Sequence, residues 1–199
     1  MEELNTSLFL LINAGDFPAP AVFLLMTFLA KWLIYGVPLL LAGMWFWGGR
    51  EARAAVLMSS VTLGIALTLN LLLGMVWMHP RPFMIGLGHQ LLAHGAESSF
   101  PSDHATVFFA VALSMLTCQL HRSGWLLMVL GAMVGWARIY LGVHYPFDIV
   151  GALLTTTLCA WGAVTLLNTA AIGPNCLALL EHLYRRLFGQ PISRGWIQP

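Results

Sequence analysis

Long apolar stretches, separated by short breaks of polar residues and glycine, run along most of the chain. A helix that crosses a membrane needs about 20 predominantly apolar residues. Five stretches approach or reach that length, at residues 31–48, 54–77, 104–121, 125–141 and 147–169. The pattern therefore predicts five membrane-spanning helices.

The N-terminal region is apolar as well, but its pattern is interrupted. Between residues 7 and 30 the polar run Asn13–Asp16 and two nearby prolines break the stretch. Such a region suits an interfacial helix, a short sixth span, or one followed by the other. We expect an all-α integral membrane protein, a bundle of five to six transmembrane helices in one domain that covers residues 1–199.

The composition agrees with a location in a bilayer. Of the 199 residues, 59% are hydrophobic and 9% are charged, whereas soluble domains carry about 25% charged residues. The formal net charge is only +1, and nucleic-acid binding needs a basic surface. Membrane lipids, and not nucleic acid, are therefore the expected partners.

Most arginines collect on one side of the predicted membrane. They are Arg50, Arg53, Arg122, Arg185, Arg186 and Arg194. Arg81 and Arg138 fall on the opposite side. Because cytoplasmic loops are enriched in Lys and Arg, the side with Arg81 and Arg138 is expected to face the periplasm or the cell exterior.

Polar and ionisable residues gather in the segments on this outer side. In so apolar a chain, residues of these types are costly and mark a functional site. They are Arg81, Ser102, Asp103, His104, Arg138, His144 and Asp148. Two guanidiniums and a hydroxyl can hold a phosphoryl group, one imidazole can attack it, and a carboxylate can orient that imidazole. The second imidazole can protonate the leaving group, so the set is typical of phosphate-ester hydrolysis.

Three segments resemble, in their order, the signature motifs of the type 2 phosphatidic acid phosphatase (PAP2) superfamily of membrane lipid phosphatases. They are Arg81-Pro82, Pro101-Ser102-Asp103-His104 and Arg138-x5-His144-x3-Asp148. The short chain and the run Leu141–Pro146 look most like the bacitracin-resistance type of undecaprenyl-diphosphate phosphatase. The resemblance implies release of inorganic phosphate from this polyprenyl diphosphate lipid, without a cofactor, at the outer leaflet of the bacterial cytoplasmic (inner) membrane. The product is the monophosphate carrier of cell-wall synthesis.

Two other functions remain open at this point. The motifs bind phosphate and do not specify the lipid, so the substrate could be phosphatidylglycerophosphate, phosphatidate or a lipid A phosphate. A transporter is a more distant alternative, because transport sites tend toward the membrane midplane and these charges cluster at one face.

The resemblance also assigns roles to the motif residues. His144 is the nucleophile and forms a transient phosphohistidine, and Asp148, one helical turn later, orients its ring. His104 protonates the leaving group and then activates water. Arg81 and Arg138 clamp the phosphoryl oxygens, since a guanidinium donates two hydrogen bonds to one phosphate.

Two further candidates lie at the start of the span that follows the second motif. Ser102 or Asp103 can cap that helix, and a helix N-terminus presents free backbone amides to an anion. Ser102 is expected to donate to the phosphate. For Asp103, phosphate contact and simple capping are equally compatible with the sequence.

The chain departs from the family pattern at two places. Ala137 replaces the serine that precedes the arginine of the third motif, and Gly74 replaces the lysine seven residues before Arg81. Counted along the two spans, Lys31 reaches a similar depth to Gly74. We therefore expect Lys31 either to supply the missing ammonium to the phosphate or to extend to the lipid headgroups.

The loop between the first two motifs, together with His79 just before the first motif, contains further polar residues. His79, His89 and His94 lack the tight spacing of zinc ligands, so no metal site is predicted. Glu97 and His94 are weak candidates for contact with the diphosphate or a bound ion, and a solvated loop is the alternative.

Overall fold

The computed structural model describes residues 1–199, apart from the side chain of Ala170, and the chain is built from helices joined by turns and loops. The bundle consists of α2 (Pro20–Thr27), α3 (Gly36–Trp47), α4 (Arg50–Val76), α5 (Asp103–Thr117), α6 (His121–Tyr140) and α7 (Pro146–Asn168). The remaining helices are α1 (Glu2–Ile12), α8 (Ile172–Leu187) and α9 (Gly189–Ser193), with short turns η1 (Phe28–Trp32), η2 (Leu33–Tyr35), η3 (Pro82–Ile85) and η4 (Thr169–Ala171). The described residues form no β-strand, so the all-α prediction is confirmed.

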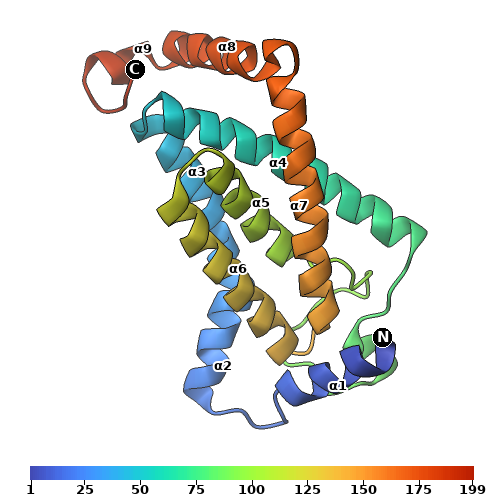
Figure 1. Cartoon of the computed structure of the whole chain (residues 1–199). Helices are drawn as coiled ribbons and strands as arrows, with labels where there is room; N and C mark the ends of the chain where they lie inside the picture. The colour runs from blue at the N-terminus through green and yellow to red at the C-terminus, as the bar shows by residue number, and fades with distance from the viewer.

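Four helical segments are long and apolar enough to cross a membrane. They are Pro20–Trp47, Arg50–Val76, His121–Tyr140 and Pro146–Asn168. α5 has only 15 residues, about 22 Å at 1.5 Å per residue. It lies in the middle of the bundle, packed on α4, α6 and α7 (Figure 1). Neighbouring helices therefore cover α5, and the chain is a multi-pass membrane protein.

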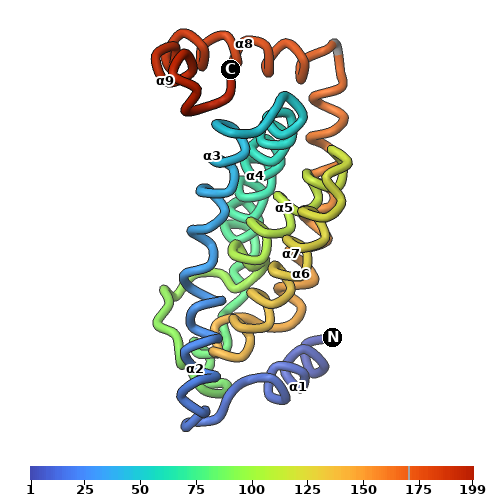
Figure 2. The backbone as a smooth tube through the Cα atoms, turned by 90° about the vertical axis from the view of Figure 1, so that its left-hand side faces the viewer, coloured from blue at the N-terminus to red at the C-terminus, as the bar shows by residue number. Residues whose placement is uncertain are grey.

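The first 47 residues fold differently from the predicted boundaries. The span expected at 31–48 begins already at Pro20, because α2 continues through η1 and η2 into α3. Proline is well suited to the first position of a helix, so Pro20 starts the span. α1 is separate and lies across one end of the bundle, with α8 and α9 at the other end (Figure 2). α1 thus takes the place of the expected interfacial helix, and the described residues form no separate span before Pro20.

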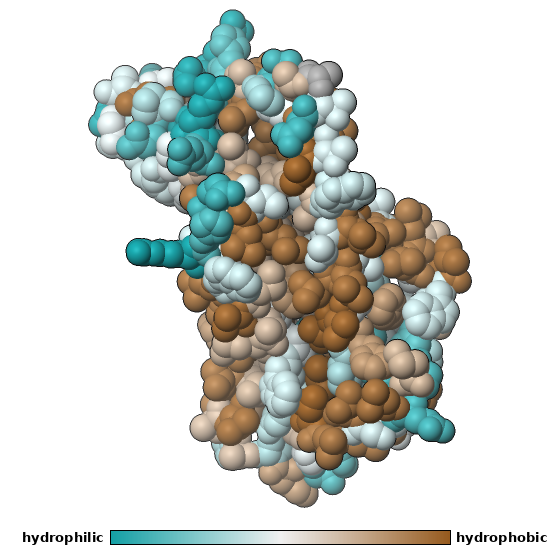
Figure 3. Space-filling view, viewed as in Figure 1, coloured by the Kyte–Doolittle hydropathy of each residue, from teal (hydrophilic) through white to brown (hydrophobic). Residues whose placement is uncertain are grey.

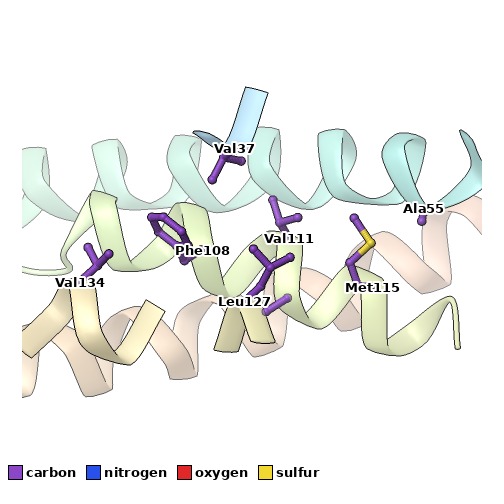
Figure 4. Close-up of a cluster of buried hydrophobic side chains, with 8 residues drawn as sticks. Val37, Ala55, Phe108, Val111, Met115, Leu127 and Val134 are labelled. Carbon is purple, nitrogen blue, oxygen red and sulfur yellow. The ribbon is translucent and has the colours of Figure 1, made fainter. Parts of the chain in front are cut away.

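A buried apolar cluster holds the bundle together around α5. Its members are Val37, Ala55, Phe108, Val111, Ala112, Met115, Leu127 and Val134, from α3, α4, α5 and α6 (Figure 4). Phe108 and Met115 are among the largest fully buried side chains. Apolar residues also cover much of the outside of the bundle, whereas polar residues gather over α8 and α9 (Figure 3). The apolar outside suits contact with lipid chains.

Candidate active site

Three parts of the chain meet at the end of the bundle that carries α1 (Figure 1). They are the loop at residues 77–102, the first turn of α5, and the turn at residues 141–145 between α6 and α7. The residues of all three predicted motifs lie in these parts or in the adjoining helix ends. The structure therefore brings together motifs that are separated by up to 67 positions, from Arg81 to Asp148.

The turn between α6 and α7 depends on a glycine. Gly142 has φ of +81°, a conformation that costs residues with a Cβ atom. A Cβ atom there would also lie 2.1 Å from the carbonyl oxygen of His89. Gly142 therefore allows the long loop to pack directly on the turn that carries His144.

His144 and Asp148 form a buried pair at the start of α7. His144 lies two residues before the helix, and Asp148 lies in its first turn. Their side chains are 2% and 1% exposed, and His144 Nδ1 lies 3.2 Å from Asp148 Oδ2. The same carboxylate oxygen accepts hydrogen bonds from the backbone N–H of Tyr145, at 2.7 Å, and from the hydroxyl of Ser99. The carboxylate is fixed by these donors, so it orients the imidazole ring.

The other ring nitrogen of His144 faces a guanidinium. Arg81 Nη1 lies 3.1 Å from His144 Nε2, and because arginine can only donate, Nε2 presents its lone pair. Burial, with further contributions from Arg138 and Arg81, holds the pKa of His144 well below its usual range. His144 is therefore a neutral imidazole with its proton on Nδ1 and an unprotonated Nε2.

Arg81 is held in place by backbone carbonyl groups. Its guanidinium donates to the carbonyl oxygens of Val143, Ser98 and Glu97, at 2.9, 3.0 and 3.2 Å. Burial lowers its pKa, and the nearby charge of Asp148 opposes this shift. These contacts connect the long loop to the α6–α7 turn and fix a positive charge beside His144.

Arg138 reaches the site from the last turn of α6. It is 2% exposed, and its Nη1 donates to the carbonyl oxygen of Ala30, at 3.0 Å, in the π-helical turn η1. Its Nε finds no hydrogen-bond partner among the described residues. A buried donor without a partner is costly, so Arg138 Nε is available to an anion.

The first turn of α5 places Ser102 and Asp103 differently. Ser102 is fully buried, makes no side-chain cap, and its hydroxyl has no hydrogen-bond partner in the described chain. Asp103 also makes no cap and instead accepts a hydrogen bond from Asn70 Nδ2 of α4, at 2.8 Å. The helix therefore begins where the sequence predicted, with Ser102 at its N-cap position, but the predicted side-chain cap is not formed.

A small polar cavity lies between His104 and Arg138. It has a volume of about 140 Å³ and is lined by Ala30, Lys31, Leu92, Ala93, His94, His104 and Arg138. The ring of His94 is 6.3 Å from that of His144, and burial followed by the charge of Arg81 lowers the pKa of His94. The cavity is thus large enough for a small anion, and cationic side chains and imidazoles line it.

An apolar groove of about 510 Å³ shares two residues, His104 and Lys31, with the polar cavity. Its other lining residues are Ile34, Tyr35, Val37, Pro38, Leu41, Leu63, Leu67 and Val107, from η2, α3, α4 and α5. Polar and apolar binding surfaces therefore meet at His104.

Lys31 and Gly74 line different cavities. Lys31 borders the cavity of His104 and Arg138, with its ammonium 5.2 Å from the Trp32 ring centre. Gly74 borders a separate pocket of about 470 Å³ that also contains Glu97 and Asp103. Glu97 and Asp103 therefore line this second pocket and not the cavity of Arg138.

The loop histidines do not converge. His79 Nε2 lies 3.6 Å from a carboxylate oxygen of Glu2, and His89 Nδ1 lies 2.6 Å from one of Asp16. Among the described residues, no group of three or more His, Cys, Asp and Glu side chains is arranged to hold a metal ion.

Two residues of the site were not predicted from the sequence. Ser99 donates to Asp148 and lies 3.4 Å from His144 Nδ1. Asn70 bonds Asp103 and also donates to Thr106, at 3.0 Å. A lone amide inside an apolar span is itself a signal of a polar contact, so Asn70 could have been found, whereas nothing local distinguishes Ser99 from Ser98.

Comparison with known proteins agrees with this geometry. Residues 54–172 match the model of the PAP2 superfamily. Over 198 residues, all of this chain and 99% of the relative, the sequence is 40% identical to Escherichia coli YbjG, which is provisionally named an undecaprenyl-diphosphatase. It is 35% identical over 134 residues to the undecaprenyl-diphosphatase BcrC of Bacillus subtilis, covering 67% of this chain and 69% of that one.

Two solved structures share the fold. Aquifex aeolicus LpxE superposes with a TM-score of 0.67 at 24% identity, over 81% of this chain and 95% of that one. A PAP2-type phosphatidylglycerolphosphate phosphatase from Bacillus subtilis gives 0.60 at 19% identity, over 85% and 87%. The extent of the family match and the identity to relatives over most of their length lead to one conclusion: the chain belongs to the PAP2 superfamily of phosphatases.

Proposed function

We propose that this protein hydrolyses undecaprenyl diphosphate to undecaprenyl phosphate and inorganic phosphate, acting as a single domain. The observation that carries the chemistry is the unprotonated Nε2 of His144, held by Asp148 on its far side and faced by Arg81. The substrate assignment is supported by the relatives named undecaprenyl-diphosphatases.

In the first step His144 Nε2 attacks the terminal phosphorus. A P–N bond forms, and the bond between that phosphorus and the bridging oxygen breaks. His104 donates a proton to the departing lipid monophosphate. Arg81, Arg138 and the Ser102 hydroxyl bind the phosphoryl oxygens as their charge increases.

The second step regenerates the enzyme. His104, now unprotonated, takes a proton from water, and the water oxygen attacks the phosphorus of phospho-His144. The P–N bond breaks, inorganic phosphate leaves, and Nε2 recovers its lone pair. Asp148 accepts the Nδ1–H hydrogen bond throughout and stabilises the positive ring of the intermediate. Positioning and charge stabilisation account for most of such catalysis, and the buried arginines provide both.

The apolar groove is the proposed place of the first part of the polyprenyl chain. It begins at His104, the residue that would protonate the bridging oxygen, and its wall is formed by side chains such as Leu63, Leu67 and Pro38. Apolar pockets of several hundred Å³ with a few polar groups at one end are typical of sites for amphiphilic ligands.

Phosphate release from purified protein tests the function. We expect turnover of undecaprenyl diphosphate well above that of phosphatidylglycerophosphate, phosphatidate and a lipid A phosphate, and unchanged turnover in a strong chelator. Preference for one of the other lipids would reassign the substrate. Activity that is lost with chelator and restored by one divalent ion would disprove the metal-free mechanism, and no turnover of any lipid would disprove the enzyme assignment.

Lys31 is proposed to bind the substrate phosphate from its position beside His104. Lys31→Ala is expected to raise KM for a diphosphate lipid about 10-fold, because one charge-assisted hydrogen bond is lost. Lys31→Arg should retain most of the affinity. If Lys31→Ala and the parent have the same KM, Lys31 does not bind the substrate phosphate and instead extends to the lipid headgroups.

The site is proposed to face the periplasm, with the protein in the bacterial inner membrane. Arg50 is the first residue of α4, Arg122 lies in the first turn of α6, and Arg185 lies in α8. These parts of the chain are at the end of the bundle opposite the site (Figure 1). Cytoplasmic surfaces are enriched in arginine and lysine.

Cysteine labelling in intact cells tests this orientation. A cysteine in place of the exposed Gln90 should react with an impermeant thiol reagent, whereas the native exposed Cys176 on α8 should react only after the cells are opened. Gly88 is unsuitable, since a Cβ atom there would lie 2.4 Å from Asn13 Oδ1. If Cys176 is labelled in intact cells and the cysteine at position 90 is not, the site faces the cytoplasm.

A further inference from the structure

α1 lies across the end of the bundle that carries the site and contacts both α6 and α7 (Figure 1). These two helices are joined by the turn that carries His144, and they contribute Arg138 and Asp148 on either side of it. α1 therefore connects the two halves of the third motif from outside the bundle. α1 itself contributes none of the groups that bind or react with the phosphoryl group.

Asn5 holds the beginning of α7. It is only 2% exposed, and its Oδ1 accepts a hydrogen bond from the backbone N–H of Phe147, at 3.0 Å. The first N–H groups of a helix have no partner within the helix, and Pro146 has no N–H at all. Asn5 thus acts as a cap supplied by another helix, at the residue that precedes Asp148.

Asn13 holds the end of α6. Its Nδ2 donates to the carbonyl oxygen of Tyr140, the last residue of α6, at 3.1 Å, and to that of His89, at 3.0 Å. Its Oδ1 accepts from the N–H of His89, at 2.7 Å. Carbonyl groups at a helix end also lack partners within the helix. Asn13 therefore fixes the end of α6, two residues after Arg138, together with the long loop.

Phe9 fills the space between the two asparagines. It is fully buried and packs with Ile139 and Tyr145, with its ring centre 5.5 Å from that of Tyr145. Asn5 and Phe9 lie one turn apart on the same face of α1, and Asn13, the residue directly after α1, continues the spacing of four. Only the centre of this row of side chains is apolar, and the asparagines at its two ends form hydrogen bonds to backbone groups of other segments. A helix that served only as a membrane anchor would not require these hydrogen bonds.

We infer that α1 is a splint that sets the geometry of the catalytic turn, with Asn5 and Asn13 as positioning residues. By fixing the start of α7 and the end of α6, α1 determines how Asp148 holds His144 and how Arg138 faces the phosphoryl group. Neither asparagine touches the substrate. The inference rests on the proposed function, because its effect is measured as turnover.

Substitution of Asn5 tests the splint. Asn5→Ala should lower kcat about 10- to 100-fold, since small displacements of reacting groups have effects of that size, with KM within about 2-fold of the parent. Asn5→Asp keeps an acceptor at the same place and should restore kcat to within about 3-fold of the parent. Ser7→Ala is the matched control, because Ser7 is exposed and its hydroxyl bonds only to Glu3 of α1 itself.

The outcomes separate this inference from the proposed function. Assays use the full chain, with undecaprenyl diphosphate and with a soluble aryl phosphate. Parent protein without turnover of either substrate would disprove the proposed function, whereas an active parent with equal kcat in Asn5→Ala would overturn the splint. Failure of Asn5→Asp to recover kcat would also overturn it. If Asn5→Ala does not fold, Asn13→Ala is tested in its place and is expected to show the same loss of kcat. Full kcat in Asn13→Ala would overturn the inference.

Discussion

Replacing His144 with alanine is expected to abolish turnover, by about 10⁴-fold or more. The imidazole supplies the Nε2 lone pair that attacks phosphorus, and the contacts of this ring with Asp148 and Arg81 hold it in place for that attack. Because the pKa of His144 is held well below its usual range, this nucleophile is unprotonated at neutral pH. Release of phosphate from undecaprenyl diphosphate measures the loss.

The covalent step can be observed directly. Parent protein mixed with substrate labelled in its terminal phosphate should retain a label that is released by acid and stable to alkali, as a phosphoimidazole is. His144→Ala should retain none. His182→Ala, at an exposed position of α8 remote from the site, is the matched control and should keep full activity. Substantial turnover in purified, folded His144→Ala would eliminate the phosphohistidine mechanism.

Most of the fold was predictable from the apolar pattern, because a membrane span needs a long apolar segment whatever its neighbours are. The exceptions are α5, which ends at Thr117 and is too short to count among the spans, and the N-terminal region. Asn13–Asp16 correctly marks the break after α1, but Pro20 begins a helix that runs on to Trp47 through a π-helical and a 3-10 turn. Nothing in the local pattern distinguishes a helix that continues through irregular turns from one that stops.

The site was predictable where a residue type is costly in lipid. Arg138 and His144 stand out from the sequence for that reason, and the structure brings them to one end of the bundle with Arg81 and Asp148. Asn70, Ser99 and Asn5 act through tertiary contacts between helices and loops that are far apart in the chain. Such contacts depend on how the helices pack, so local spacing does not predict them.

His104→Ala is expected to lower kcat about 10²- to 10⁴-fold with substrates whose leaving group is a strong base. His104 lines both the polar cavity and the apolar groove, so it lies at the boundary between the phosphoryl group and the lipid. Departure of an alkoxide, as from phosphatidate, requires a proton from this residue. A nitrophenolate leaves without protonation, so the loss in the first step should be small for nitrophenyl phosphate.

The two steps then respond differently to the same substitution. His104→Ala should still transfer the phosphoryl group from nitrophenyl phosphate to His144, but water lacks its base in the second step. Rapid mixing should therefore show a burst of nitrophenolate close to one equivalent of enzyme, followed by slow turnover, with labelled phosphohistidine accumulating. Addition of imidazole should accelerate the slow phase, because it can replace the missing base. An equal loss with alkyl and nitrophenyl leaving groups, without a burst, would show that His104 is neither the acid nor the base and acts only in binding.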